Sequence, residues 1–504
     1  MNFLAWDKDK ADSMTENEKI SRSSWRILVI LSCLGLVAMI AETMVLPAIP
    51  DFIRDFNISY STSSWILSSY LIAGAVMTPI AGKLSDIYGK KKILLVVLSV
   101  YCFGILAAGF ANSIEFMVAA RIAQGVIVSI FPVAFGIIRE VFPMKKLAVA
   151  QSVFSSTFSG GAVIGLLVGA GIIQNYGWHA TFFTMLPISV GLLLVILRFI
   201  HIKRAETVPP SDSFETTSEK NTAQANRNLM QIDLKGILTL AATIVLFLSG
   251  LTYLQNSLES SGFEVMALFA GAAVSLALFI LVEKRTDNPL VDLKLITHRT
   301  LLPAILILMI AGLATFMVYQ TIPVMIRSPH PLGFGGDAIT IANVQLPFMI
   351  VLLIGTSTSG LSLNKLGNTR LAAIGTIIGT IGFFSLLMFH SSEFMVAATL
   401  AVISAGLSLS ITGGFNVVLV SAPAKAIGIA LGMTVLLLMV GQSVGPTVAG
   451  MYQQMYQGTV MGGLFPTEEA YNMIFLTAGL ISLVSVAFAL ALYRRKIIPP
   501  VDSY

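Results

Sequence analysis

Long apolar runs, repeated along the whole chain, limit its possible folds more than any other feature. A membrane-crossing helix needs about 20 mostly apolar residues, and hydrophobic residues make up 56% of this chain against 11% charged. Soluble domains are about 25% charged, so the sequence predicts an all-α polytopic membrane protein. The fourteen expected spans lie near residues 27–49, 64–82, 93–112, 116–138, 148–173, 180–200, 234–254, 264–282, 300–326, 338–361, 371–389, 394–418, 426–451 and 472–493.

The first apolar run is predicted to stay in the protein as a membrane span. Residues 1–26 are polar and charged, and the run from Ile27 to Ile49 has no small-residue cleavage site of the kind that ends a signal peptide. The two cysteines, Cys33 and Cys102, both lie inside apolar runs. A disulfide framework is therefore not expected.

The distribution of Lys and Arg predicts the orientation, because cytoplasmic loops retain positive charge. If the N-terminus is placed inside and the spans alternate, only Arg54 and Arg327 fall in outer loops. We therefore expect a multi-pass protein of the inner or plasma membrane with both termini cytoplasmic. The same distribution explains the net charge of +5 without a nucleic-acid partner. The inner segments hold Lys83, Lys90, Lys91, Lys92, Arg139, Lys145, Lys146, Lys203, Arg204, Lys220, Arg227, Lys284, Arg285, Lys365, Arg370, Lys425, Arg494, Arg495 and Lys496.

A polar segment divides the spans into groups. Residues 201–233 are rich in Ser, Thr, Asn, Gln, Glu and Pro, a composition too polar to pack and typical of a flexible linker. The expected layout is a cytoplasmic tail (1–26), a six-helix bundle (27–200), the cytoplasmic linker (201–233), two inserted helices with a loop (234–299), a second six-helix bundle (300–493) and a cytoplasmic tail (494–504).

Two sequence features occur once in each bundle. The segment Gly82–Lys92 (GKLSDIYGKKK) resembles Gly360–Arg370 (GLSLNKLGNTR) at an offset of 278 residues. Gly161 and Gly165 match Gly441 and Gly445 at an offset of 280 residues, with Gly169 matched by Ala449. Nearly equal offsets indicate two homologous halves, an architecture typical of alternating-access transporters with the substrate site between the repeats.

Several of these segments resemble the major facilitator superfamily. Gly82–Lys92 matches its signature G-x-L-[AS]-D-x-x-G-[RK]-[RK]-[RK], and Arg121–Gly125 (RIAQG) matches its R-x-x-Q-G signature. Residues 232–236 (IDLKG) and 283–293 (EKRTDNPLVDL) are similar to the family's drug:proton antiporters with fourteen spans, which include bacterial multidrug and tetracycline exporters. The resemblance implies a fold of two six-helix bundles plus two central helices, and proton-driven export of small amphiphilic, drug-like molecules.

Two spans depart from the antiporter pattern. In G-x-x-x-G-P-x-x-G-G of the fifth span, Leu166 replaces the proline and Ala170 the last glycine, whereas the thirteenth span keeps Gly445 and Pro446. The first span carries Glu42 before Thr43, where the family has D-x-T. These departures leave a proton-coupled symporter for uptake of a metabolite or peptide as the alternative.

Glu42 is the acidic residue that we expect deep in a span. A charged carboxyl in hydrocarbon is costly and usually faces a cavity or a partner, and such a group can bind a proton on one side of the membrane and release it on the other. Arg121 lies at a similar predicted depth, roughly 8–10 Å below the outer surface at about 1.5 Å per residue, and the resemblance makes their helices neighbours. The alternatives are a structural hydrogen bond for Glu42 and, for Arg121, a structural clamp on backbone carbonyls.

The Gly82–Lys92 segment is predicted to be part of a gate. Gly82 and Gly89 permit tight turns and close approach, and Asp86 can accept hydrogen bonds from a helix N-terminus. The resemblance places that terminus in the thirteenth span, near Lys425. Lys90 and Lys91 are expected to pair with Glu140, and the alternative is that the lysines only set the topology.

The glycine rows of the fifth and thirteenth spans allow close helix packing, and the resemblance implies a leak-proof interface between the halves. Substrate contacts are predicted for polar or aromatic residues within the spans. They are Gln124, Tyr70, Tyr319, Gln320, Asn343, Gln345 and Asn416.

Other functional classes lack their signatures. The five histidines are unclustered, and there is neither metal-ligand spacing nor a phosphate-binding loop, which disfavours a membrane enzyme or an ATP-driven pump. The repeat disfavours a channel. We expect a monomer that needs no cofactor or metal and binds lipid, a small-molecule substrate and protons, with the proton gradient as its energy source.

Overall fold

The computed structural model describes residues 22–200, 233–254, 262–286, 289, 295, 297–423 and 427–494. Fourteen of its helical segments are long and apolar enough to cross a membrane, which confirms the predicted number of spans. The two tails up to residue 21 and from residue 495, most of the predicted linker, and Lys425 lie outside the described residues.

The N-terminal bundle contains the first six spans. Its helices are α2 (Arg22–Thr43), α3 (Ile49–Asp55), α4 (Tyr60–Tyr88), α5 (Lys90–Gly109), α6 (Ile114–Gly125), α7 (Ile130–Val141), α8 (Met144–Tyr176) and α9 (His179–Phe199), with short 3₁₀ helices η1 (Leu46–Ala48) and η2 (Val126–Ser129).

The first span differs from the continuous helix that we predicted over residues 27–49. Helix α2 ends at Thr43, and the chain passes through η1 into α3, so that the span extends to Asp55. Pro47 and Pro50 explain the break, because proline lacks the amide proton that a helix interior requires. Glu42 therefore lies in the last turn of α2, at a helix end inside the membrane-spanning segment.

The C-terminal bundle follows the inserted helices α11 (Leu234–Tyr253) and α12 (Gly262–Arg285). It consists of α14 (Leu301–Arg327), α15 (Ala338–Leu366), α16 (Asn368–Met388), α17 (Glu393–Ser421), α18 (Ile427–Met455) and α19 (Glu468–Tyr493). A hairpin of β1 (Gln457–Val460) and β2 (Gly463–Pro466), which the sequence analysis did not predict, joins α18 to α19.

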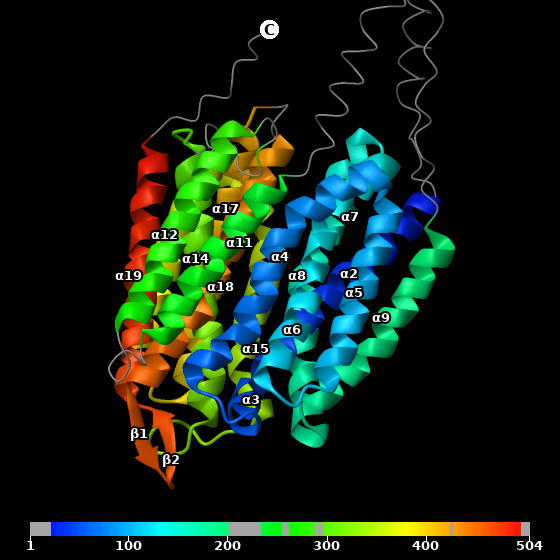
Figure 1. Cartoon of the computed structure of the whole chain (residues 1–504). Coiled ribbons are helices and arrows are strands. Elements are labelled where there is room, and N and C mark those ends of the chain that lie inside the picture. The colour runs from blue at the N-terminus through cyan, green and yellow to red at the C-terminus, as the bar shows by residue number, and fades with distance from the viewer. Residues whose placement is uncertain are drawn as a thin grey trace, which may run out of the picture.

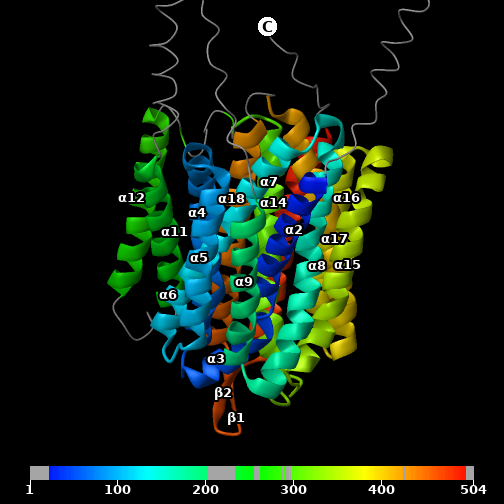
Figure 2. The ribbon, with the colours of Figure 1, turned by 90° about the vertical axis from the view of Figure 1, so that its right-hand side faces the viewer.

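The two bundles stand side by side with their helices roughly parallel (Figure 1). They meet along two seams, where α4 packs against α18 and α8 packs against α15. We call the face where α2 begins and α19 ends the termini face, and the other the opposite face. The β1–β2 hairpin projects from the opposite face (Figure 2).

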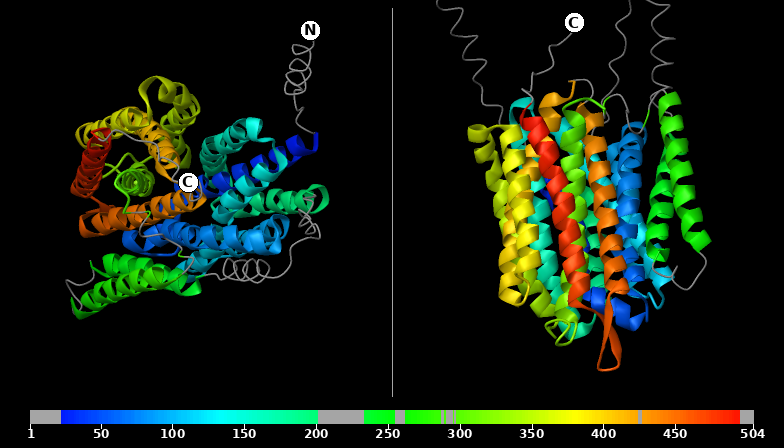
Figure 3. Two further views of the ribbon diagram at one scale, coloured as in Figure 1. Left: turned by 90° about the horizontal axis from the view of Figure 1, so that it is seen from above. Right: turned by 90° about the vertical axis from the view of Figure 1, so that its left-hand side faces the viewer.

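The inserted helices lie along one side of both bundles, as the view from above shows (Figure 3). Helix α11 contacts both α4 and α18. Leu240, Ile244 and Leu248 of α11 share a buried cluster with Ile72 of α4 and Met433 of α18. The insertion thus covers the α4–α18 seam.

The internal repeat is visible in the backbone. Gly89 (φ +96°) separates α4 from α5, and Gly367 (φ +81°) separates α15 from α16. Ser113 and Ser392 both cap a following helix, with nearly the same backbone angles. Since only glycine adopts such φ values without strain, these turns explain one glycine of each repeat.

The glycine rows pack within each bundle, not between the bundles as the resemblance implied. A Cβ on Gly161 would lie 2.7 Å from the Leu36 carbonyl oxygen of α2, and one on Gly169 would lie 2.6 Å from Met44. A Cβ on Gly165 would collide with Thr43, which donates a hydrogen bond to the Ala162 carbonyl at 3.1 Å.

The second bundle repeats this contact between α18 and α14. A Cβ on Gly441 would collide with the Met309 carbonyl, and one on Gly445 with the Leu313 carbonyl. The rows therefore join the first and fifth spans of each bundle. The seams between bundles are built from other residues.

Candidate functional site

Glu42 faces the interior between the bundles. Its side chain is half-buried and lies within electrostatic range of Arg121, Tyr70 and Tyr319. Tyr70 belongs to α4 of the N-terminal bundle and Tyr319 to α14 of the C-terminal bundle. The predicted carboxyl therefore has neighbours in both halves of the protein.

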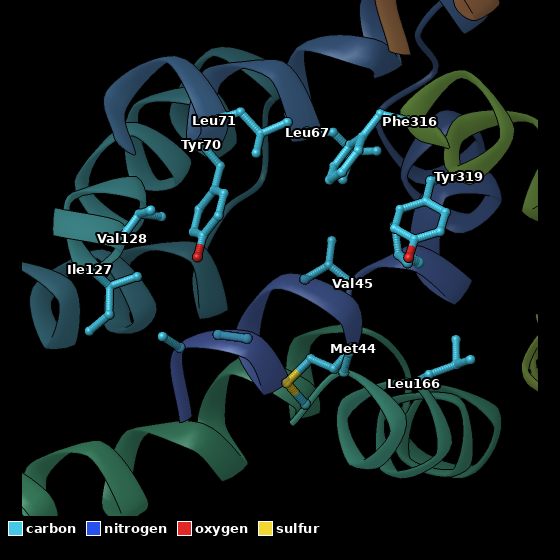
Figure 4. Close-up of a cluster of buried hydrophobic side chains, with 14 of the residues drawn as sticks. Met44, Val45, Leu67, Tyr70, Leu71, Ile127, Val128, Leu166, Phe316 and Tyr319 are labelled. Carbon is cyan, nitrogen blue, oxygen red and sulfur yellow. The ribbon is translucent and has the colours of Figure 1, made fainter. Parts of the chain in front are cut away.

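Tyr70 and Tyr319 belong to one cluster of buried hydrophobic side chains. Tyr70 and Tyr319 lie on either side of Val45, near Leu67 and Phe316 (Figure 4). The Tyr319 ring packs against Phe316 at 5.0 Å between ring centroids. Its hydroxyl donates to Met349 Sδ at 3.7 Å. An apolar, aromatic interior with a few polar groups is typical of small-molecule sites.

Arg121 is fully buried in α6. Its Nε donates to the Ile66 carbonyl of α4 at 3.0 Å, and its Nη1 donates to Gln124 Oε1 at 2.9 Å. The guanidinium stacks over the Tyr70 ring at 4.5 Å from the centroid, while Nη2 has no hydrogen-bond partner among the described residues. Arg121 thus clamps a backbone carbonyl, as one alternative held, and also interacts electrostatically with Glu42.

The R-x-x-Q-G segment joins three helices. Gln124 Nε2 donates to the Gly104 carbonyl of α5 at 3.0 Å. A Cβ on Gly104 would lie 2.8 Å from the Gln124 backbone nitrogen, and a Cβ on Gly125 would collide with the Tyr70 carbonyl of α4. These close approaches hold Arg121 and Tyr70 in place. Both polar groups of Gln124 have partners in the protein, because Oε1 accepts from Arg121 and Nε2 donates to Gly104.

The other predicted substrate contacts have different surroundings. Gln320 Nε2 donates to Ser63 Oγ of the other bundle at 2.9 Å, and within the described part of the chain its Oε1 has no partner. Gln345 is buried, and neither of its amide atoms is paired with a residue that the structure describes. Asn416 donates to Thr412 of its own helix at 2.8 Å, and Asn343 is exposed. Their role in substrate binding stays a prediction.

The predicted gate segment is mostly helical. Gly82 lies inside α4, where a Cβ would have only Pro132 at 3.9 Å, so it is neither a turn nor a close approach. Lys90 Nζ pairs with Glu140 Oε1 at 2.5 Å, whereas Lys91 Nζ donates to the Leu197 carbonyl at 2.9 Å instead of to Glu140. The side chain of Asp86 lies outside the described residues.

Several polar contacts between the bundles lie toward the opposite face, and sequence reasoning missed them. Arg327 pairs with Asp51 at 3.0 Å. The backbone nitrogen of Tyr60 donates to Gln454 Oε1 at 3.1 Å, and Ser68 Oγ donates to the Ser443 carbonyl at 2.7 Å. The sequence signal that could have indicated them was Arg327, one of the two arginines predicted to lie in outer loops.

Comparisons with known proteins agree with this architecture. The solved structure of the nucleoside transporter NupG superposes with a TM-score of 0.62 at 12% identity, covering 93% of this chain and 100% of that one. An auto-inhibited peptide transporter of the POT family gives a TM-score of 0.60 at 15% identity, covering 95% of this chain and 99% of that one. At these identities the likeness shows the fold alone.

Curated relatives are more similar in sequence. Multidrug resistance protein 3 of Bacillus subtilis (strain 168) is 28% identical over 373 residues, which are 72% of this chain and 67% of the relative. The tetracenomycin C resistance and export protein of Streptomyces glaucescens is 25% identical over 458 residues, 88% of this chain and 78% of the relative. The multidrug efflux pump LfrA of Mycolicibacterium smegmatis is 25% identical over 456 residues, 88% and 84% of the two chains.

The sequence model of one family covers most of the chain, and its match runs from residue 31 to residue 446. It includes the R-x-x-Q-G junction, the Gly82–Lys92 segment and both glycine rows. With two six-helix bundles and fourteen spans in the structure, the chain belongs to the Major Facilitator Superfamily.

Proposed function

We propose that this protein is a proton-coupled antiporter that exports small amphiphilic molecules by alternating access. Its relatives include proteins named for multidrug resistance, multidrug efflux and tetracenomycin C export. The observation that carries the proposal is the position of Glu42, half-buried at the broken end of α2 and within electrostatic range of groups in both bundles.

This position links protonation to bundle movement. Arg121 and Tyr70 move with Glu42 because they share its bundle, whereas Tyr319 belongs to the other one. When the bundles rock, the surroundings of Glu42 change, and its preference for the proton changes with them. By linkage, binding of a proton then shifts the equilibrium between the two arrangements.

The interior limits the substrates. One carboxyl in an apolar, aromatic setting favours neutral or singly charged amphiphiles over dications. Tyr319, Gln320, Gln345, Asn343 and Asn416 are the proposed contacts from the C-terminal bundle. The proton gradient supplies the energy, and no cofactor is part of the mechanism.

We place the termini face in the cytoplasm of a plasma membrane, because the excess of Lys and Arg lies in the segments on that face. The Gly82–Lys92 segment with Glu140 would close this face when the substrate leaves on the other side. The domain limits proposed from the sequence, with bundles at 27–200 and 300–493 and the insertion at 234–299, complete the layout for a monomeric carrier.

The test is transport by purified protein in liposomes. With ethidium as a singly charged amphiphilic probe, an imposed proton gradient should drive the probe opposite to the proton flux. Glu42→Gln should abolish this gradient-driven movement, because the amide cannot release a proton. It should leave probe binding within about threefold, a change of less than 1 kcal/mol.

Glu393→Gln is the matched control, since Glu393 is exposed in the first turn of α17 and should not affect transport. Gradient-driven efflux that persists in Glu42→Gln would rule out Glu42 as the coupling residue. Movement of the probe in the same direction as the protons would identify a symporter instead.

A further inference from the structure

Helix α3 is fixed to the N-terminal bundle by an aromatic cluster. Trp178, which precedes α9, packs against Phe52 and Phe56 at centroid distances of 4.8 and 5.5 Å. Its indole Nε1 donates to Asp55 Oδ2 at 2.9 Å. Because Trp178 belongs to the N-terminal bundle and contacts Phe52 and Asp55 of α3 and its C-cap Phe56, we expect α3 to move with that bundle.

Asp51 projects from α3 toward the other bundle. Its Oδ1 accepts a hydrogen bond from Arg327 Nη2, at the last residue of α14, at 3.0 Å. The side chain of Asp51 is only 8% exposed and that of Arg327 30% exposed. Arg54, in the same helix as Asp51, approaches the same oxygen at 3.2 Å but is 67% exposed. The partly buried pair is the Asp51–Arg327 contact across the seam.

Arg327 also has a carboxylate in its own bundle within electrostatic range. Asp337 caps α15: its Oδ1 accepts hydrogen bonds from the backbone nitrogen and Oγ1 of Thr340, both at 2.8 Å. These bonds, with a smaller contribution from Arg327, lower the pKa of Asp337 below its ordinary value. The backbone holds this carboxylate near the end of α14, because Gly336 N donates to the Ile326 carbonyl and Gly335 N to the Ser328 carbonyl, both at 2.8 Å. Asp337 therefore stays near Arg327 whatever the N-terminal bundle does.

We propose that Arg327 is a latch that exchanges carboxylates, pairing with Asp51 when the opposite face is closed and with Asp337 when that face opens. The proposal rests on the alternating access proposed above but not on drug export or proton coupling. On opening, α3 carries Asp51 away with the N-terminal bundle. Arg327 then turns to Asp337, so its guanidinium keeps a carboxylate partner in both arrangements.

The latch predicts opposite effects from its two carboxylates. Loss of Asp51 removes an interaction of the closed state only, so the opposite face should open more often. Loss of Asp337 removes an interaction that is strongest in the open state, so the face should open less often. A purely structural role for either residue would not give effects of opposite sign on opening.

A buried reporter cysteine measures opening without substrate or gradient. Ser64 of α4 is fully buried, with Thr447 of α18 at 3.5 Å. Ser64→Cys would be placed in a background with Cys33→Ala and Cys102→Ala and labelled with a maleimide in nanodiscs. Asp51→Asn should label about tenfold faster, as expected for a close charge pair across an interface, and Asp337→Asn about threefold slower.

Arg327→Gln provides the decisive background, because without the arginine neither carboxylate has a latch partner. In that background, Asp51→Asn and Asp337→Asn should each leave the labelling rate unchanged. Arg54→Gln, which alters a contact within α3, should change the rate less than twofold as a matched control. Unchanged labelling in Asp51→Asn, or carboxylate effects that persist in the Arg327→Gln background, would overturn the latch.

Asparagine keeps the helix cap at position 337, so Asp337→Asn should fold even if Asp51→Asn does not. Slower labelling in that variant then supports the latch, and an unchanged or faster rate overturns it. Since labelling requires no transported molecule, failure of this test is distinct from failure of the proposed export function.

Discussion

At the scale of single residues, Arg121 shows how one side chain can serve both the fold and the proposed function. It bonds a carbonyl of α4 and the amide of Gln124 while it stacks on Tyr70. The planar guanidinium makes these contacts together, whereas the ammonium of lysine is a point charge without such a fork.

Arg121→Lys should therefore destabilise the protein although it keeps the charge. Loss of a buried, charge-assisted hydrogen bond costs about 1.5–3 kcal/mol, so the thermal midpoint in detergent should fall by several degrees. Arg139→Lys, at an exposed position near the end of α7, should leave the midpoint unchanged. Equal midpoints for the two variants would contradict the clamp.

The sequence could place Glu42 and Arg121 within membrane spans because a charge in an apolar run is rare and costly. Their role in proton coupling stays a prediction. The sequence could not identify the partners of Arg121, since the Ile66 carbonyl carries no side-chain signal. Gln124 and Tyr70 were predicted as substrate contacts because the sequence does not show that Arg121 bonds the one and stacks on the other. Asp51 was missed because it lies beyond the helix break, among ordinary loop charges.

At the scale of elements, the glycine rows determine how closely α2 approaches α8 and α14 approaches α18. Gly165→Ala should destabilise the protein by about 1–3 kcal/mol, because the added methyl overpacks the contact with α2. Gly171→Ala is the matched control in the same helix, since nothing lies within 4 Å of its Cβ position. That control should be neutral or slightly stabilising, because alanine favours helix by about 1 kcal/mol over glycine.

Thermal unfolding of the two variants is the measurement. If Gly165→Ala were as stable as Gly171→Ala, the close approach of α2 and α8 would not exist in the protein. Gly445→Ala and Gly432→Ala give the same comparison in α18, where only the first position is crowded.

Hydropathy predicted all fourteen spans because each apolar run has about the length needed to cross a bilayer. The breaks within spans depend on proline positions that a hydropathy window averages out. Pro47 and Pro50 accompany the break after Thr43. Pro132 accompanies η2, because its ring clashes with the carbonyl of residue 128 four positions earlier.

At the scale of the whole molecule, the inserted helices bridge the bundles on the α4–α18 side. Trp65 Nε1 of α4 donates to Thr252 Oγ1 of α11 at 3.1 Å. Trp65→Phe should remove this bond while keeping an aromatic ring, at a cost of about 0.5–1.5 kcal/mol. The thermal midpoint should fall accordingly, whereas Trp25→Phe at an exposed position should not change it.

A Trp65→Phe variant with the parent midpoint would show that this bond does not hold the insertion to the seam.

The repeat offsets predicted the two bundles, but they could not predict which side the insertion covers. That choice depends on apolar surface of α4 and α18 far apart in sequence, such as Ile72 and Met433. Membership in a transporter family confirms that the chain is a transporter and not an enzyme.

The β1–β2 hairpin is an exposed element that extends beyond the two bundles (Figure 2). Its tip residue Met461 is 92% exposed, and the Leu464 carbonyl of β2 accepts a hydrogen bond from the Tyr60 hydroxyl of the other bundle at 3.2 Å. An antibody fragment whose epitope spans the hairpin and the start of α4 would recognise one conformation only. Such a fragment would act as an inhibitor that never enters the membrane.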